Sequence, residues 1–204
     1  MTLSEFDNEI RKDHNVVCGC DEAGRGPLAG DVFAAAVIFD KDTVIEGIND
    51  SKKLTAKKRE ELFDEIMEKA VDFSIQTATV AEIEDINILN AAMLAMKRAV
   101  EDMDTKPDVC LIDGNKTPKD LECPAIAVVK GDAKSQAVAA ASILAKVARD
   151  RYMEQMAELY PEYRFEKHKG YGTKLHYQMI DQYGPCGIHR MSFLKKYYAK
   201  KNGH

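Results

Sequence analysis

Short apolar runs and longer amphipathic stretches alternate along the chain. Residues 16–21 and 32–39 are rich in small and β-branched apolar side chains, and Gly and Pro separate them. This pattern predicts two strands joined as an antiparallel hairpin. Residues 72–80 alternate like a third strand. The apolar runs in 108–115 and 125–132 predict two more strands, and each of these runs ends in an aspartate.

Apolar residues recur at helical spacing between the strands. Residues 55–70 predict a helix that Thr55 can cap, and 86–103 and roughly 134–159 predict two longer helices. From residue 161 onward the pattern indicates turns and short helices. Strands that alternate with helices favour an α/β layer fold, and the first hairpin makes the sheet mixed.

Length and composition place the chain among ordinary globular proteins. It has 204 residues, 45% of them hydrophobic and 31% charged, which suits one domain or one domain with a helical appendage. The longest apolar run, VFAAAVIF, is of strand length and too short to span a bilayer. The polar N-terminal stretch MTLSEFDNEIRKD has no apolar signal-peptide core. We therefore expect a cytoplasmic protein with no membrane segment.

Cysteine usage argues against a disulfide framework and against structural zinc. The five cysteines stand at positions 18, 20, 110, 123 and 186. Their number is odd and no C-x-x-C pair occurs. Because Cys18 and Cys20 alternate on a predicted strand, we expect both to be small core residues on the same side.

The charge is distributed unevenly along the chain. The formal net charge is −5, which disfavours a polyanionic partner. From Arg164 to the end, however, nine Lys or Arg face two acidic residues, so this segment carries +7 and residues 1–163 carry −12. An acidic body with a basic C-terminal fifth fits a protein that contacts phosphates with one part only.

Three predicted strands have carboxylate residues at or just beyond their ends. The segments are VVCGCDE, VCLIDG and AVVKGD, and their acids are Asp21, Glu22, Asp113 and Asp132. In open α/β sheets, ligands bind beyond strand ends, where separate segments converge. Converging carboxylates repel one another unless a cation lies between them, and oxygen ligands favour Mg²⁺ or Mn²⁺.

Each acid also has a simpler interpretation. Asp113 precedes a glycine and can be a turn residue, and Asp132 can cap the helix that follows. Glu22 can form an ion pair with Arg25. The recurrence of acids at three strand ends, rather than any single residue, favours a metal site.

Gly24, Arg25 and Gly26 follow the first pair of acids directly. Without Cβ atoms, the two glycines let a ligand approach the main chain, as is needed to read a sugar hydroxyl with backbone groups. The segment is no dinucleotide loop, because G-x-G-x-x-G is absent and no helix follows. Walker and G-x-S-x-G motifs are absent too, and the five histidines form no zinc-protease motif.

An ordered set of motifs resembles the ribonuclease HII family. The motifs are CDEAGRGPLAG, NDSKKLT, IDGN, VVKGD, AAASILAKVARD, KGYGT and HRMSF, and they span residues 18–193. The resemblance implies an RNase H-like mixed β-sheet flanked by helices, with a C-terminal helical extension. We expect a catalytic domain over 1–160 and an extension over 161–204, packed as a single structural unit.

The resemblance also implies an activity. Members cut the RNA strand of RNA–DNA hybrids and cut on the 5′ side of single ribonucleotides embedded in duplex DNA. Two divalent ions, Mg²⁺ or Mn²⁺, serve the hydrolysis, which leaves a 3′-hydroxyl and a 5′-phosphate. The chain is more similar to bacterial members, since no sliding-clamp-binding tail of the archaeal kind is obvious. We expect a monomer.

Residue roles follow from the same resemblance. Asp21, Glu22, Asp113 and Asp132 match the catalytic, metal-binding acids. The Gly24, Arg25 and Gly26 segment matches the part that senses the 2′-hydroxyl. Tyr171 in KGYGT matches the tyrosine that packs on the sugar at the junction, although a tyrosine between glycines is often only a packing residue. Its basic surroundings suit a nucleic-acid backbone.

Several polar residues are weaker candidates for substrate contacts. These candidates are Lys52, Ser135 and Lys146. Lys53, Arg149 and Arg151 could also contact phosphates, but solvated charges or helix ion pairs explain all the basic residues equally well. Ser142 can simply let its helix pack closely on the sheet. We expect His168 and His189 to be structural polar groups.

Two further functions stay open at this stage. Another RNase H-like nuclease, such as a junction resolvase or a transposase relative, would share the acidic site but would not need the Gly-Arg-Gly segment. A non-catalytic RNA- or hybrid-binding module would bind without metal. Four convergent carboxylates disfavour this second function, because they repel a polyanion unless cations fill the site.

Overall fold

The computed structural model describes residues 1–48, 51 and 54–201. Over these residues five strands form one mixed sheet in the order β3-β2-β1-β4-β5. The strands are β1 (Val17–Ala23), β2 (Val32–Ile38), β3 (Asp72–Ala78), β4 (Val109–Asp113) and β5 (Ala125–Val128). The helices are α1 (Leu3–Ile10), α2 (Ala56–Lys69), α3 (Val80–Glu101), α4 (Gln136–Leu159), α5 (Phe165–His168), α6 (Lys174–Tyr183) and α7 (Met191–Lys201), with short 3₁₀ turns η2 (Gly131–Ala133) and η3 (Pro161–Tyr163).

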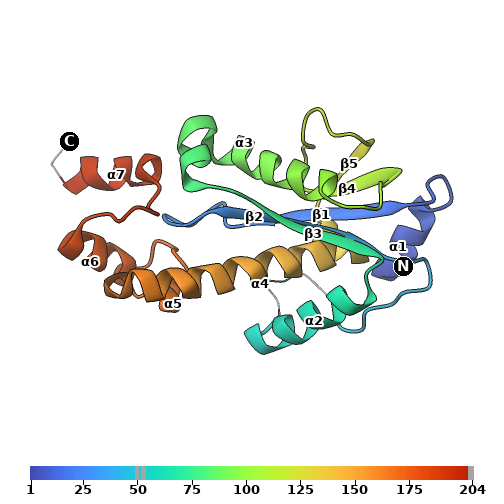
Figure 1. Cartoon of the computed structure of the whole chain (residues 1–204), viewed down its shortest axis with the longest axis horizontal. Helices are drawn as coiled ribbons and strands as arrows, with labels where there is room; N and C mark the ends of the chain where they lie inside the picture. Colours follow the sequence, from blue (N-terminus) through green and yellow to red (C-terminus); the bar gives the residue numbers. More distant parts are fainter. Residues whose placement is uncertain (49–50, 52–53, 202–204) are drawn as a thin grey trace.

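The sheet combines antiparallel and parallel pairs. Strand β1 pairs antiparallel with β2, and β2 pairs antiparallel with β3. On its other side β1 pairs parallel with β4, and β4 pairs parallel with β5. Helix α3 covers one face, whereas α4 and α2 cover the other (Figure 1). The predicted α/β layer fold with a mixed sheet is therefore confirmed, and so is the initial hairpin.

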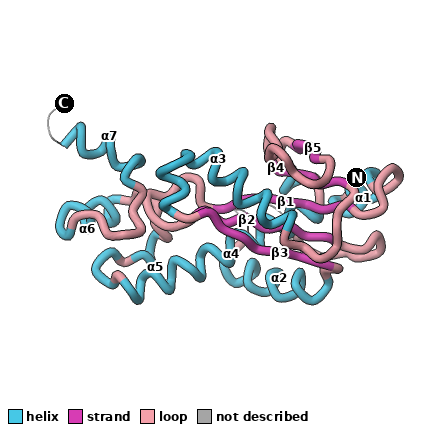
Figure 2. Tube along the Cα trace, turned by 45° about the horizontal axis from the view of Figure 1, so that its top comes forward, coloured by secondary structure: helices cyan, strands magenta, loops and turns pink. Residues whose placement is uncertain are grey.

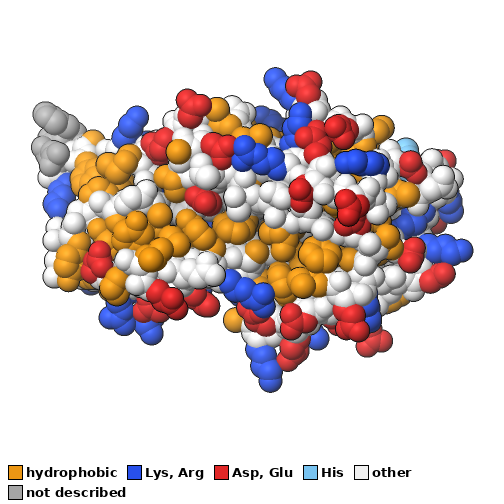
Figure 3. Space-filling model, in the orientation of Figure 1, with side chains coloured by type: hydrophobic (Ala, Val, Ile, Leu, Met, Phe, Trp, Pro, Cys, Tyr) orange, Lys and Arg blue, Asp and Glu red, His pale blue; other side chains and the backbone are white. Residues whose placement is uncertain are grey.

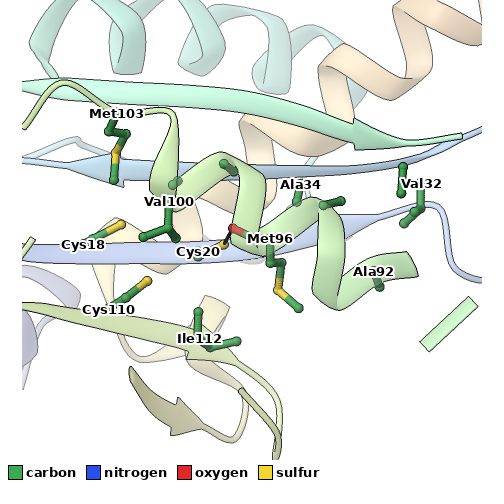
Figure 4. Close-up of a cluster of buried hydrophobic side chains, with 14 of the residues drawn as sticks. Cys18, Cys20, Val32, Ala34, Ala92, Met96, Val100, Met103, Cys110 and Ile112 are labelled. Carbon is green, nitrogen blue, oxygen red and sulfur yellow. Dashed lines mark hydrogen bonds between the residues drawn. The ribbon is translucent and has the colours of Figure 1, made fainter. Parts of the chain in front are cut away.

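Small side chains bring the layers close together. Cys18, Cys20 and Cys110 lie in the core between the sheet and α3, beside Met96 (Figure 4). All five cysteines of the chain lie in described residues and are free thiols, as expected. On the opposite face the backbone of α4 passes so near Gly19 that a Cβ there would overlap it. Glycine at this position fixes the spacing between β1 and α4.

Helix α3 begins earlier than the predicted 86–103. Thr79 and Glu82 form a capping box, in which each side chain accepts a hydrogen bond from the other residue's amide. The helix is then interrupted at Asn87, which has a φ of 67°. Its Oδ1 accepts hydrogen bonds from the amides of Leu89 and Asn90, so Asn87 caps the second part of the helix. The sequence prediction captured that second part only.

Helix α1 buttresses the start of α4 and was not predicted. Asp7 of α1 is buried, and its Oδ2 accepts a hydrogen bond from the amide of Ala137 at 2.9 Å. The side chain of Ser135 caps the same helix by accepting from the amide of Val138. Asp7 from a distant segment and the N-cap residue Ser135 thus satisfy amides that the first turn of α4 leaves without helical partners.

The segment after α4 packs at one end of the sheet. In two views, α6 and α7 lie beyond the sheet at the end opposite α1 (Figures 1 and 2). Phe165, Ile180 and Leu194 form a core there with Met153 of α4 and Leu28 of the β1–β2 connection. Figure 3 shows a hydrophobic band along one face, with charged side chains mostly above and below it. Among the described residues, none of the helices has the length and apolar content needed to cross a membrane.

Candidate active site

Asp21 and Glu22 occupy the end of the central strand β1. Asp21 is buried, and Glu22 is partly buried. The Asp21 Oδ1 accepts a hydrogen bond from the Glu22 amide at 2.7 Å. Burial, followed by repulsion from Glu22 and Asp113, raises the pKa of Asp21 well above its ordinary value. Positive charge nearby would favour the ionised form of this carboxyl group.

Asp113 ends β4, the parallel neighbour of β1. Its Oδ1 accepts a hydrogen bond from the amide of Gly131 at 2.7 Å, which ties it to η2. Asp132 is the next residue in η2 and is buried. The sheet order thus brings Asp21, Glu22 and Asp113 into mutual electrostatic contact, and one hydrogen bond joins Asp113 to the residue beside Asp132. The N-cap of α4 is Ser135 and not Asp132.

The carboxylates fit a divalent cation by their chemistry. All are oxygen donors, and the mutual repulsion and burial at Asp21 are what a bound cation would relieve. In the described part of the chain, no three or more His, Cys, Asp and Glu side chains lie close enough together to hold a metal ion in this conformation. The assignment of metal ligands therefore rests on the chemistry of the donors and on their electrostatic contact.

A pocket of about 200 Å³ joins the acids to the glycine segment. Glu22, Ala23, Gly24, Arg25, Gly26, Ser51, Ser142, Lys146 and Tyr171 line it. Gly24 has a φ of +102°, a conformation that favours glycine. The exposed Arg25 donates a hydrogen bond to Glu22 at 3.1 Å, which is the ion pair considered from the sequence. Residues from β1, the β1–β2 connection, α4 and the α5–α6 loop thus meet in one pocket.

A second cavity of about 220 Å³ adjoins the same acids. Glu22 and Arg25 line it together with Asp113, Gly114, Asn115, Lys116 and residues of α3. Because Glu22 and Arg25 belong to both cavities, the two form neighbouring parts of one surface. Glu22 of β1 therefore lines both cavities, whereas Asp113 of β4 lines only the second and the buried Asp21 lines neither.

Tyr171 stands at the rim of the first pocket. It is 44% exposed, and its ring lies 5.9 Å from the guanidinium carbon of Arg149. The Leu28 amide donates to the Gly170 carbonyl at 2.8 Å, which joins the tyrosine loop to the β1–β2 connection. An exposed ring on an anchored backbone is suited to stacking.

The weaker candidates have different environments. Lys146 lines the pocket but pairs with Asp150 at 2.5 Å, and burial lowers its pKa. Lys52, like Lys53, lies outside the described residues. Ser135 is fully buried and its side chain caps α4, so the structure gives no support to its predicted substrate contact.

The two arginines of α4 also differ from the sequence expectation. Arg149 is buried and donates to backbone carbonyl groups, so it cannot contact phosphates in this conformation. Arg151 pairs with Glu60 and lies over the ring of Phe63. The interpretation as a helix ion pair therefore describes Arg151 better than a phosphate contact does.

Sequence reasoning missed Ser51 and Arg190, and it interpreted Ser142 only as a packing residue. The hydroxyls of Ser51 and Ser142 lie 2.9 Å apart in the pocket. Ser142 stands out as the one polar residue in the apolar stretch AAASILA, and this signal could have been used. Arg190 is fully buried beside the glycine segment. It belongs to the motif HRMSF, which contributes to the family resemblance, but the motif assigned no role to this side chain.

Comparison with known proteins identifies the family. The model of the family "Ribonuclease HII" matches residues 18–196. The chain belongs to the ribonuclease HII family. A ribonuclease HII from Caldicellulosiruptor saccharolyticus is 56% identical over 189 residues, covering 93% of this chain and 92% of the relative. Another from Idiomarina loihiensis is 58% identical over 178 residues, covering 87% and 95%.

Solved structures agree with this family assignment. The crystal structure of ribonuclease H2 from Pyrococcus horikoshii is 29% identical, covers 93% of this chain and 100% of its own, and has a TM-score of 0.75. A ribonuclease HIII crystallised with Mn²⁺ is 18% identical with a TM-score of 0.66, which shows the shared fold. The predicted RNase H-like fold is confirmed, and the chain is a ribonuclease H enzyme. A non-catalytic binding module and a junction resolvase are disfavoured by the same findings.

Proposed function

We propose that this enzyme hydrolyses the RNA strand of RNA–DNA hybrids and cuts on the 5′ side of single ribonucleotides in duplex DNA. The products are a 3′-hydroxyl and a 5′-phosphate. One observation carries the proposal: a single pocket brings the acid Glu22, the Gly24, Arg25 and Gly26 backbone and the ring of Tyr171 together. Such a pocket can hold a phosphate, a sugar hydroxyl and a sugar face at the same time.

The acids would hold the cations. Asp21, Glu22, Asp113 and Asp132 supply the carboxylate oxygens that Mg²⁺ and Mn²⁺ prefer. Two such ions, when bound, would activate a water and stabilise the charge on the phosphate and the departing oxygen. The chain itself fixes the acids on the ends of β1 and β4 and in η2. The hydrogen bonds from the Glu22 amide to Asp21 and from the Gly131 amide to Asp113 orient two of the carboxylates.

Discrimination between RNA and DNA would rest on the backbone around Arg25. RNA and DNA differ at the 2′-hydroxyl of the sugar. The amides of Arg25 and Gly26 have no hydrogen-bond partner among the described residues, so both can donate to a sugar oxygen. A site with polar groups that pair only with a hydroxyl disfavours the deoxy sugar, since its groups stay unpaired. Tyr171 would pack on the sugar at the junction.

The test is a cleavage assay on a DNA duplex with one embedded ribonucleotide. The duplex is end-labelled and incubated with Mg²⁺, with Mn²⁺ and with EDTA, and an all-DNA duplex of the same sequence is the control. We expect a metal-dependent cut on the 5′ side of the ribonucleotide only. The upstream fragment should end in a 3′-hydroxyl that a DNA polymerase can extend. Extension checks for the 3′-hydroxyl directly.

Other outcomes would contradict separate parts of the proposal. Equal cutting of both duplexes would refute sugar recognition while leaving the metal site. Cutting in EDTA would refute metal dependence. A cut on the 3′ side of the ribonucleotide, or an end that is not extended, would refute the proposed chemistry. The cytoplasmic location, the monomeric state and the division at residue 160 stay predictions from the sequence.

A further inference from the structure

Two arginine side chains are buried beneath the glycine segment. Arg149 of α4 is 1% exposed, and Arg190, just before α7, is 0% exposed. Burying a cation is costly unless its donors are satisfied. In the described residues neither guanidinium donates to a carboxylate. Together they donate to seven backbone carbonyl groups, those of Gly24, Arg25, Pro27, Ala29, Gly30, Asp31 and Lys169.

Arg190 binds the inner side of the glycine segment. Its guanidinium donates to the carbonyl of Gly24 at 2.7 Å and to that of Arg25 at 3.2 Å. Two further bonds reach Pro27 at 2.9 Å and Gly30 at 2.8 Å. The planar, forked guanidinium has five N–H donors, which lets one side chain hold a whole turn of backbone.

Peptide planarity converts these contacts into an orientation of the amides. In a trans peptide the carbonyl of one residue and the amide of the next lie in one plane and point in opposite directions. Because the carbonyls of Gly24 and Arg25 point toward Arg190, the amides of Arg25 and Gly26 point away from it. Both residues are exposed and line the pocket of about 200 Å³. Consecutive amides with a common direction form a site for an oxygen ligand.

Arg149 fixes the same segment from another side. It donates to Ala29 and Lys169 at 3.1 Å each, so it joins the β1–β2 connection to the loop that carries Tyr171. Its side chain also lies where a Cβ of residue 24 would be, which explains glycine at that position. Burial lowers the pKa of Arg190 to about 9, so the guanidinium stays charged at neutral pH.

We propose that Arg190 and Arg149 are positioning residues that set the specificity for the 2′-hydroxyl, Arg190 by turning the amides of Arg25 and Gly26 outward and Arg149 by holding Tyr171 beside them. This inference rests on the proposed function. It assigns a role to two side chains that are too deeply buried to touch the substrate. Specificity for the ribose sugar then depends on residues from the C-terminal extension as well as from the sheet.

The test compares Arg190→Lys and Arg149→Lys with Arg11→Lys. Lysine keeps the charge but has only three donors, so it cannot reproduce the four contacts of Arg190. Arg11 is a matched control, because it donates to the Phe39 carbonyl at 2.8 Å far from the pocket. Fluorescence anisotropy gives the Kd for a duplex with one ribonucleotide and for the all-DNA duplex. Both are measured in Ca²⁺, and gels confirm that the duplexes stay intact.

The preference is the Kd for the all-DNA duplex divided by the Kd for the duplex with one ribonucleotide. We expect this ratio to fall about tenfold in Arg190→Lys, the equivalent of one lost hydrogen bond. Arg11→Lys should keep the wild-type ratio. Partial unfolding lowers the active fraction equally for both duplexes, so a merely structural role would leave the ratio unchanged. Hydrogen exchange provides a second readout: the amides of Leu28 and Gly30, which bond Gly170 and Ile188, should lose protection in Arg190→Lys.

Distinct results separate the two proposals. A wild-type enzyme with no preference for the ribonucleotide would refute the proposed function itself. A normal wild-type preference that Arg190→Lys and Arg149→Lys both retain would overturn only the positioning role. Unchanged exchange at Leu28 and Gly30 would do the same. If Arg190→Lys fails to fold, Arg149→Lys decides by the same two measurements.

Discussion

Asp113 is the acid whose removal tests the metal site at the scale of a single residue. Its carboxylate interacts with Asp21 and accepts a bond from Gly131. Asparagine preserves the size and that acceptor but removes the charge. We expect Asp113→Asn to lower kcat/KM about 100-fold or more, because even changing residues that only support a metal ligand costs 10–100-fold.

The control for this prediction is Asp64→Asn on the exposed side of α2. It should leave kcat/KM unchanged. Both variants should unfold at about the wild-type temperature, which a differential scanning measurement checks. Wild-type activity in Asp113→Asn would remove this residue from the metal site.

Tyr171 tests the stacking role of an exposed ring. A ring that stacks on nucleic acid contributes about 1–3 kcal/mol by alanine substitution. We therefore expect Tyr171→Ala to lower kcat/KM on the single-ribonucleotide duplex by about 5–150-fold, while Tyr171→Phe retains most activity. Tyr183→Ala, at an equally exposed tyrosine of α6, is the control. Loss of activity in Tyr171→Phe as well would assign the role to the hydroxyl group instead.

At the scale of elements, the docking of α1 on α4 depends on Asp7. Its carboxylate caps amides at the start of α4, the helix that carries Ser142, Lys146 and Arg149 toward the site. We expect Asp7→Ala to lower the free energy of unfolding by about 1–2 kcal/mol, the usual cost of losing a helix cap. Urea denaturation measures this change.

The exposed Glu9 on the same helix provides the comparison. Among the described residues its side chain pairs only with Lys12 at the surface, so Glu9→Ala should change the free energy of unfolding by no more than about 0.5 kcal/mol. Equal effects of Asp7→Ala and Glu9→Ala would show that the cap does not stabilise α4.

At the scale of the whole molecule, buried histidines join the C-terminal helices to the site. The amide of Cys186 donates to His189 Nδ1 at 2.9 Å, so Nε2 of His189 carries the proton. That nitrogen contacts His176 Nε2 at 3.0 Å, and His176 Nδ1 contacts the Tyr171 carbonyl at 2.9 Å. The three contacts are mutually consistent only if both rings are neutral. Protonation would place two N–H groups against each other.

These histidines predict a stability that depends on pH. Burial lowers the pKa of His176 and of His189 to about 4 from the ordinary 6.5. A lowered pKa means that the folded state binds protons less readily than the unfolded state. The stabilisation is therefore complete above pH 6.5 and is lost as the pH falls from 6.5 toward 4.

Urea denaturation between pH 7.5 and pH 5 measures this loss. Each pH unit in that range costs up to about 1.4 kcal/mol for each group. His189→Asn should be less stable at pH 7.5 and should show a shallower pH dependence. His14→Asn, at a histidine outside the cluster, should keep the wild-type slope. An unchanged slope in His189→Asn would show that this histidine does not cause the acid sensitivity.

The sequence by itself predicted the order of the five strands and of the three long helices, and it placed four acids at or just beyond the ends of three strands. Alternation in 72–80 and helical spacing in 55–70 predict local structure because period and burial are linked along a single element. The acids at the ends of β1 and β4 could be recognised because a carboxylate after an apolar run has few structural reasons to be there. The boundary of α3 was missed because the Asn87 interruption hides a capping box upstream.

Only the tertiary structure decided which polar groups face the pocket. A surface arginine and the buried Arg190 look alike in a sequence, as do an exposed serine and the buried Ser135. Their roles depend on carbonyl groups and amides that come from segments far apart in the chain. Arg190 binds Gly24 across 166 positions, and such contacts form only once the sheet and the C-terminal helices pack together. Local pattern sets the elements, and packing sets the direction of each side chain.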